Sequence, residues 1–313
     1  MARSLTDWCE ALMHNRFLKA GLDKRTWIGL ILVMTTCMPW RMTAAEETRL
    51  TRDGRNKRDP VFIENGETLV YVVDESSIKM RMLRRDMQTG ETVPYHKDAP
   101  KSEFAPAFSA DGQFYAFIQS RGNLSLALVI RDIQGIKSAE VKPAGGFSGM
   151  RSPAISPTGE RVLYCFPENG SQQIFSVNME ATDRKPLTDV RGVDNWPSYT
   201  PDGKTIVFGS TRDGNYEIYS MTSAGKDVRR LTNSPMQDIR PVISHDGTRI
   251  AFASQRDGNR EIYVMNLDGS GLRRVTNHPE RDDYPAWHPD GKRIALVSER
   301  AGRFDLYMIN VDP

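Results

Sequence analysis

The sequence predicts an all-β fold, a six-bladed β-propeller with four antiparallel strands in each blade. A turn that ends in glycine recurs six times, and successive glycines are 46, 47, 44, 44 and 44 residues apart. A proline precedes each glycine by six residues. A period of about 40–45 residues filled with short strands and turns is typical of propeller blades. The recurring pairs are Pro60 and Gly66, Pro106 and Gly112, Pro153 and Gly159, Pro197 and Gly203, Pro241 and Gly247, and Pro285 and Gly291.

Each repeat divides into four predicted strands separated by turns. The fourth repeat shows the pattern most clearly, and its proline is tolerated because it opens the first strand. The second strand is largely apolar and rich in β-formers, which suits burial between neighbouring sheets. Glycine supplies the positive φ that the tight turns need. The expected strands are Trp196–Tyr199, Thr205–Ser210, Glu217–Met221 and Arg229–Thr232.

The sixth repeat ends without a fourth strand, and the N-terminal part of the propeller region supplies one. Thr48–Thr51 resembles Arg229–Thr232 and stands at the same distance, 15 residues, before the next motif glycine. We expect this N-terminal strand to close the last blade, because an open array would leave sheet edges exposed. Residues 46–313 are therefore predicted to form a single six-bladed propeller.

The first 45 residues are predicted to direct export. Basic residues precede a 14-residue apolar run, Trp27–Trp40, and small residues up to Ala45 follow it. The run is short for a membrane span, which needs about 20 residues. The pattern is typical of a secretory signal peptide, and an uncleaved membrane anchor at residues 27–40 or a lipid-modified Cys37 are the alternatives. Each of them places the propeller in the periplasm or otherwise outside the cytoplasm.

Charge gives no indication of a nucleic-acid partner. The formal net charge is +2, and the basic residues of the repeats alternate with acidic ones and form no stripe. The N-terminal segment Met1–Ala45 holds six basic and three acidic residues, so the propeller region is close to neutral. A membrane is expected as a partner only through the N-terminal segment, if that segment is not cleaved.

The repeat resembles that of the TolB-like β-propeller family, whose unit contains Pro-Asp-Gly-Lys, Arg-Asp-Gly-Asn and Glu-Ile-Tyr. The segment Trp196–Asn310 matches this pattern closely, and Asp59–Thr188 matches it loosely. We expect an exported scaffold whose partner is an envelope protein or a cell-wall ligand, and the resemblance implies the peptidoglycan-associated lipoprotein as the envelope protein. It also implies an α/β domain before the propeller in TolB itself. Only residues 46–59 separate Ala45 from Pro60, so we expect this domain to be missing, and participation in the Tol system stays open.

No catalytic motif is visible in the sequence. There is no Gly-x-Ser-x-Gly elbow, and His245 and His288 are interpreted as solvated turn residues because they lack metal-ligand spacing. Cys165 is interpreted as a packed core thiol, with a reactive nucleophile as the alternative. The sequence therefore predicts a protein that is not an enzyme and has no cofactor, although a cation in the channel stays open. A hydrolase or lyase with its site in the channel is the runner-up, and a peptidase gate acting in trans is a third option.

Repeated acids and arginines are expected to support the blades. Asp202, Asp246 and Asp290 are predicted to cap their own turns by accepting backbone hydrogen bonds. Arg212, Arg256 and Arg300 recur once in a blade, which favours a structural ion-pair or stacking role.

The candidate binding residues are those that differ between repeats just before the first-strand proline, near the channel mouth. A face that mixes Trp, Tyr, Phe and Arg has the composition of a protein-recognition surface; a solvated rim with stacked aromatics is the alternative. The candidates are Arg58, Phe104, Arg151, Asn195, Trp196, Arg240, Asp283 and Tyr284, together with the acids Asp194, Asp238 and Asp282 in three of the repeats.

Overall fold

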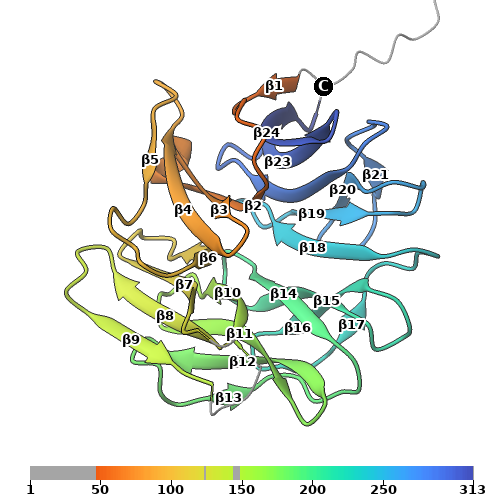
Figure 1. Cartoon of the computed structure of the whole chain (residues 1–313). Coiled ribbons are helices and arrows are strands. Elements are labelled where there is room, and N and C mark those ends of the chain that lie inside the picture. The colour runs from red at the N-terminus through yellow and green to blue at the C-terminus, as the bar shows by residue number, and fades with distance from the viewer. Residues whose placement is uncertain (1–46, 123–124, 144–148, 313) are drawn as a thin grey trace, which may run out of the picture. The chain divides into compact units, whose positions relative to one another are not determined.

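The computed structural model describes residues 47–122, 125–143 and 149–312, and these residues form six four-stranded antiparallel sheets (Figure 1). The predicted signal peptide or anchor at residues 1–45 lies outside the described residues. Blade 1 contains β2 (Lys57–Ile63), β3 (Thr68–Ser76), β4 (Lys79–Asp86) and β5 (Thr92–Pro94); blade 2 contains β6 (Glu103–Phe108), β7 (Phe114–Ser120), β8 (Leu126–Asp132) and β9 (Ser138–Val141). Blade 3 contains β10 (Arg151–Ile155), β11 (Arg161–Glu168), β12 (Ser171–Asn178) and β13 (Lys185–Pro186).

The remaining blades follow the same order, and the last one combines both ends of the described chain. Blade 4 contains β14 (Asp194–Tyr199), β15 (Thr205–Ser210), β16 (Glu217–Thr222) and β17 (Arg229–Arg230); blade 5 contains β18 (Asp238–Ile243), β19 (Arg249–Ser254), β20 (Glu261–Asn266) and β21 (Arg273–Arg274). Blade 6 contains β22 (Asp282–Trp287), β23 (Arg293–Arg300), β24 (Arg303–Asn310) and β1 (Glu47–Arg49). In residues 47–122, 125–143 and 149–312, no helix is long and apolar enough to cross a membrane.

The innermost strands form a closed ring. They contact one another in the order β2, β6, β10, β14, β18 and β22, and β22 contacts β2 again. Figure 1 shows the same arrangement, with the first strand of each blade nearest the centre. The predicted all-β, six-bladed propeller is confirmed.

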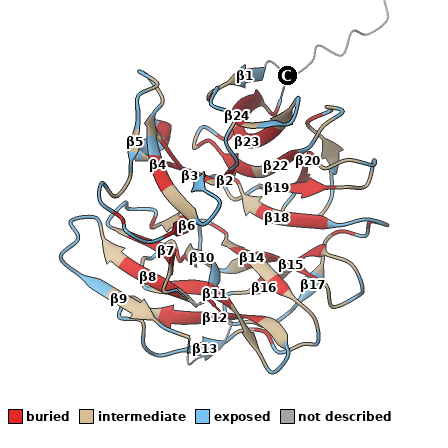
Figure 2. Ribbon diagram, viewed as in Figure 1, coloured by how far each residue is buried: buried red, intermediate tan, exposed pale blue. Residues whose placement is uncertain are grey.

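The core lies between neighbouring blades, in the second and third strands of each sheet. Figure 2 shows buried residues concentrated in these strands and exposed residues in the turns and outer strands. In β15, the stretch Ile206–Ser210 is buried throughout, as expected for a strand covered on both faces. Cys165 in β11 is fully buried, and burial raises the pKa of its thiol. This confirms the packed core thiol and gives no support to a reactive nucleophile.

The structural roles predicted for the repeated turn acids and arginines are confirmed. The Asp202 carboxylate accepts the Lys204 N–H at 3.0 Å, and the equivalent aspartates of the next two blades cap their turns in the same way. Arg212 forms an ion pair with Asp194 at 3.2 Å, and its counterparts in blades 5 and 6 form the corresponding pairs. The residues that recur in every repeat of this group therefore stabilise the blades.

The N-terminal strand closes the last blade as predicted. β1 pairs with β24 in antiparallel register, with Thr48 opposite Met308. Beyond the strand, the buried Thr51 hydroxyl donates to Asp305 at 2.7 Å and accepts the Leu306 N–H at 3.0 Å. The Arg49 guanidinium also contacts Asp305, at 2.6 Å. Residues more than 250 positions apart are thus joined by one carboxylate.

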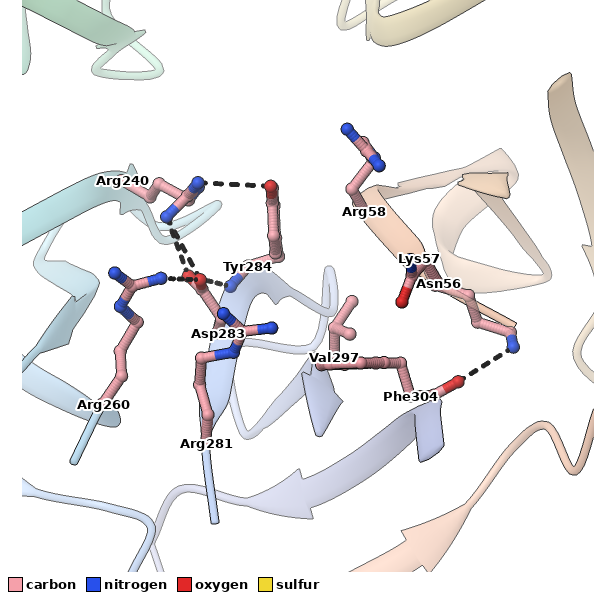
Figure 3. A pocket seen from close by; sticks show the side chains of 10 residues that line it. All are labelled: Asn56, Lys57, Arg58, Arg240, Arg260, Arg281, Asp283, Tyr284, Val297 and Phe304. Carbon is pink, nitrogen blue, oxygen red and sulfur yellow. Dashed lines mark hydrogen bonds and ion pairs between the residues drawn. The ribbon is translucent and has the colours of Figure 1, made fainter. Parts of the chain in front are cut away.

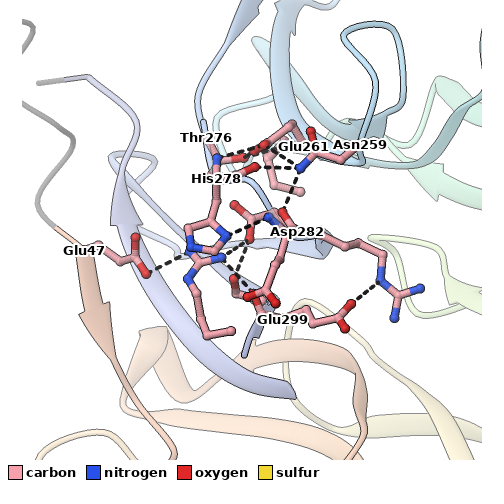
Figure 4. Close-up of polar contacts among 12 residues, drawn as sticks. Glu47, Asn259, Glu261, Thr276, His278, Asp282 and Glu299 are labelled. Carbon is pink, nitrogen blue, oxygen red and sulfur yellow. Dashed lines mark hydrogen bonds and ion pairs between the residues drawn. The ribbon is translucent and has the colours of Figure 1, made fainter. Parts of the chain in front are cut away.

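The same carboxylate-threonine contact holds the outer strand in other blades, and Figure 4 shows the one in blade 5. There the fully buried Glu261 accepts hydrogen bonds from the Thr276 hydroxyl at 2.5 Å and the His278 N–H at 2.8 Å. In blade 4, Glu217 accepts from the Thr232 hydroxyl at 2.6 Å. In blade 6 the acid is Asp305, and its threonine, Thr51, comes from the other end of the described chain.

One histidine prediction was wrong. His245 is exposed on its turn, as predicted, but His288 is only 8% exposed. Its ring lies edge-on against Phe62 of blade 1, with the centroids 4.9 Å apart. Gly66 leaves room for it, because a Cβ there would lie 2.3 Å from His288 Nε2. His288 therefore fills the junction between blades 6 and 1, whereas the equivalent residues of blades 2 to 5 are serine or threonine.

We expect Thr51→Ala to destabilise the propeller. The change removes two buried hydrogen bonds at the closure, which should reduce the free energy of unfolding by about 1–3 kcal/mol. For a domain of this size, we expect the melting temperature to fall by roughly 3–8 °C, as measured by calorimetry. Thr92→Ala, on the exposed outer strand of blade 1, is the control and should change it by less than about 1 °C. Equal melting temperatures for Thr51→Ala and the wild type would contradict the closing role.

His288 should make stability depend on pH. Burial and the nearby Arg293 charge lower its pKa in the folded protein, so the unfolded chain takes up the proton first as pH falls. The contribution of the neutral ring is therefore present above the unfolded pKa of about 6.5 and is lost below it. We expect the melting-temperature difference between the wild type and His288→Ser to shrink between pH 7.5 and pH 5. A difference that stays constant with pH would contradict the burial of a neutral ring.

Candidate binding site at the channel mouth

Each of the six inner strands carries a β-bulge at the residue before its proline. The pairing register shifts there in every blade, for example between Asn195 and Ser198 in β14. The pre-proline residue has a left-handed backbone in all six blades, and none of the six is glycine. Their φ angles are 51° for Asp59, 51° for Ala105, 48° for Ser152, 53° for Trp196, 54° for Arg240 and 53° for Tyr284.

The bulge explains why the proline recurs. In a bulge, two residues of one strand lie opposite a single partner, so the ladder hydrogen bonding is interrupted. Proline has no N–H to lose at such a point. A left-handed backbone is unfavourable for residues other than glycine and persists only where the surrounding structure enforces it. The repeat thus holds a variable side chain in one fixed backbone conformation in each blade.

The acids three residues before the proline are structural, so three of the candidate residues are corrected. Asp194, Asp238 and Asp282 are 0% exposed, and each pairs with an arginine of its own blade. Burial raises the pKa of Asp238 and of Asp282, and the paired arginine opposes that rise. The equivalent residues of the other blades, Lys57, Glu103 and Met150, are also buried. These side chains point into the blade, and a partner cannot reach them.

Arg240 is the centre of the remaining candidates. Its guanidinium lies 5.1 Å from the Trp196 ring centroid and 4.1 Å from that of Tyr284. The same group donates to Asp283 at 3.1 and 3.2 Å and to the Tyr284 hydroxyl at 3.2 Å (Figure 3). Cation–π contact and charge-assisted hydrogen bonds both fix the side chain. The pre-proline residues of blades 4, 5 and 6 therefore form one stack across three blades.

Trp196 has room in this stack because a neighbouring position is glycine. A Cβ on Gly209 would lie 3.0 Å from Trp196 Cε3, whereas other blades hold Cys165, Ala253 and Val297 at that position. The Trp196 ring also packs against Tyr216, with the centroids 5.1 Å apart. Trp196 thus packs against Gly209 and Tyr216, and its side chain is only partly exposed.

A cavity of about 330 Å³ adjoins Arg240 where blades 5, 6 and 1 meet. Figure 3 shows its lining, in which the side chains come from three blades. Asp283, only 3% exposed, is its one acidic lining residue. The basic residues that line it are Lys57, Arg58, Arg240, Arg260 and Arg281.

Two of these arginines, Arg260 and Arg281, were not among the residues singled out from the sequence. Arg260 Nη1 donates to Asp283 at 2.5 Å, so Arg240 and Arg260 share one carboxylate. Arg281 lies over the Phe304 ring at 5.0 Å and approaches Glu299 only to 3.8 Å. Repeat comparison could have found both, because neither position holds a basic residue in the neighbouring repeats.

The other lining cations have partners of their own. The buried Lys57 ammonium contacts Asp53, Asp305 and the Phe304 carbonyl. Arg58 donates to Asp74 at 2.8 and 3.0 Å. These two residues contribute positive potential to the cavity, but their hydrogen-bonding capacity is largely used within the protein.

Asp59 is a carboxyl group at the channel with a perturbed pKa. Burial raises the pKa of Asp59, and the positive charges of Arg240 and Arg58 oppose the rise. Its Oδ2 accepts the Ala105 N–H of the next blade at 3.2 Å.

The remaining candidates lie away from the cavity. Phe104 packs against the core clusters on both sides of blade 2. Arg151 is exposed at the start of β10. Asn195 Oδ1 accepts the Ser152 hydroxyl at 2.8 Å and the Trp196 N–H at 3.0 Å. The structure therefore brings together Arg58, Trp196, Arg240, Asp283 and Tyr284, and leaves these three outside the group.

The chemistry of the site favours an anionic ligand over a metal ion. In the part of the chain that the structure describes, no group of three or more His, Cys, Asp or Glu side chains could hold a metal. The guanidinium groups at the cavity supply planar donors that match a carboxylate or a phosphate.

Comparison with solved structures shows the same fold. TolB from Acinetobacter baumannii is 21% identical, with a TM-score of 0.65, over 79% of this chain and 65% of that chain. A putative TolB from Agrobacterium tumefaciens is 18% identical, with a TM-score of 0.66, over 84% and 93%. An oligogalacturonate lyase in complex with manganese is 16% identical, with a TM-score of 0.62, over 87% and 94%. This chain spans about two thirds of the A. baumannii TolB, and the low identities show the fold alone.

Family models agree with the repeat pattern. The model of the Tricorn protease N-terminal β-propeller domain matches residues 215–312. The model of the TolB β-propeller domain matches residues 90–252, which is more than half of the sequence. The chain therefore belongs to the TolB β-propeller domain family.

Proposed function

We propose that this protein is an exported, non-enzymatic scaffold of the cell envelope that binds a protein partner at the channel mouth. The observation that carries the proposal is the stack of Trp196, Arg240 and Tyr284 across three blades. Trp, Tyr and Arg are the residues most enriched at the energetic centres of protein interfaces. The proposed partner is a peptidoglycan-associated lipoprotein, which the family resemblance supports, with a cell-wall ligand as the alternative.

The geometry of the stack suits recognition. Each of its three side chains is half-buried, so little rotamer freedom is left to lose when a partner binds. The backbone beneath them is held by the bulges, and Arg240 is held by Asp283. A rigid surface of this kind can bind a partner without first rearranging.

Export is the second element of the proposal and rests on the N-terminal segment. The basic region and the apolar run Trp27–Trp40 support a periplasmic location or a membrane-anchored one.

We expect Trp196→Ala and Arg240→Ala to weaken partner capture while the propeller stays folded. Truncation of an interface anchor typically costs about 2 kcal/mol or more of binding free energy, which is roughly thirtyfold. The measurement is crosslinking in intact cells, followed by quantification of the captured envelope protein. Arg191→Ala, at an exposed arginine away from the stack, is the matched control and should capture as the wild type does. Capture by Trp196→Ala and Arg240→Ala that equals capture by the wild type and by Arg191→Ala would refute a binding role for the stack.

An enzyme is the second candidate, and Asp59 is the observation in its favour. A channel carboxyl group with a raised pKa has the property required of a general acid. In this case the purified protein would cleave a glycan or a lactone, and Asp59→Asn would reduce kcat by about 10²–10⁴-fold. Assays with uronic-acid oligosaccharides and sugar lactones decide the matter. Absence of turnover by the wild-type protein would leave the scaffold as the function, and equal turnover by Asp59→Asn would exclude Asp59 as the general acid.

A further inference from the structure

We infer that the cavity between blades 5, 6 and 1 is a carboxylate-binding subsite, and that it takes an acidic side chain of the protein partner. This inference rests on the proposed scaffold function and names the chemistry of the partner. The cavity holds about 330 Å³, which is at the lower end of small-ligand sites. It is large enough for one side chain and too small for an extended oligomer.

The cations of the cavity exceed the acids that face them. Arg240 and Arg260 share the single carboxylate of Asp283. Arg281 has only the 3.8 Å approach of Glu299, and its side chain is 45% exposed. Asp59 is not among the residues that line the cavity. A further anion is therefore needed to balance the arginines that meet at this point.

Hydrogen-bond donors are also left over. Arg240 Nε and Arg260 Nε have no acceptor among the described residues but are covered by protein atoms, so a ligand in the cavity would meet the terminal nitrogens of these guanidinium groups. Arg260 donates to Asp283 through one nitrogen only, so an edge of its guanidinium remains for a second carboxylate. The charge excess and the unused donors point to the same ligand class.

The scaffold does not require these arginines. Arg260 precedes Glu261, and the residues that precede the equivalent acids are Tyr216 and Phe304. Arg281 stands where the previous repeat has Gln237. The repeat folds with neutral residues at both positions, so the basic cluster is specific to this junction.

A carboxylate fits better than a stacked sugar. Sugar recognition by stacking needs a free aromatic face, but Trp196 is already covered by Arg240 and Tyr216. The neighbouring Trp, Arg and Tyr side chains match the centre of a protein interface, which favours an acidic residue of a protein.

The test is titration of the full-chain protein with N-acetyl-glutamate α-methylamide, the smallest mimic of a glutamate within a peptide. Its neutral glutamine counterpart, galacturonate and inorganic phosphate are titrated in parallel at constant ionic strength. Calorimetry measures the affinity, and NMR follows the Nε–H resonances of Arg240 and Arg260. The double variant Arg260→Tyr/Arg281→Gln copies residues found in blade 4 and before blade 5, so it should fold, and its melting temperature verifies this. Arg191→Ala is the control variant.

We expect saturable binding of the glutamate mimic, a shift of the Arg260 Nε–H resonance, and about tenfold weaker binding to the double variant, equivalent to ~1.4 kcal/mol. Equal binding of the glutamate and glutamine mimics, or equal affinity of the double variant, would overturn the inference. If galacturonate or phosphate bound more tightly than the glutamate mimic, the inference of an acidic side chain would be overturned, and the cavity would be assigned to that ligand.

Cell crosslinking separates this inference from the scaffold function. If the double variant still captures the envelope partner and Trp196→Ala does not, the scaffold stands and the carboxylate subsite fails. If the glutamate mimic binds and no envelope protein is captured by the wild type, the subsite stands and the scaffold function fails.

Discussion

The closed ring depends on one buried carboxylate. Asp305 accepts hydrogen bonds from Thr51 and Arg49 and forms an ion pair with Lys57. It therefore connects the N-terminal strand and the first blade to the last blade. Each sheet of a propeller is covered only by its neighbours, so an open ring would leave two blade faces in water. The same junction forms the wall of the cavity, because Phe304 lies beside Asp305 and its carbonyl accepts from Lys57. The cavity therefore depends on the closed ring, because its lining comes from both sides of this junction.

The fold could be predicted in detail because its signals are local and repeated. The spacing of proline and glycine indicated the number of blades, and the segment Thr48–Thr51, at its fixed distance before Gly66, indicated how the ring closes. The structure confirms Thr51 as the donor to the acid of the last blade. The same contact recurs in blades 4 and 5. The pairing register of the closing strand could therefore be predicted from the repeat spacing.

The candidate site could be predicted only in part, because its contacts cross between blades. The variable pre-proline positions were visible, and Arg240 and Tyr284 do meet. The burial of Asp282 was missed because the direction of its side chain depends on the start of the bulge. Arg260 and Arg281 were missed because the residues that bring them together belong to different blades. His288 was misassigned because the Phe62 ring that covers it comes from the far end of the described chain.

The bulges separate backbone shape from side-chain identity. Asp, Ala, Ser, Trp, Arg and Tyr all adopt nearly the same left-handed conformation before the proline, with φ between 48° and 54°. The blade enforces that conformation, so a substitution there changes what the channel mouth presents without changing where the chain runs. Related propellers can diverge at these six positions and keep the ring intact. For the same reason, protein engineers could vary them together to give this scaffold a new binding specificity.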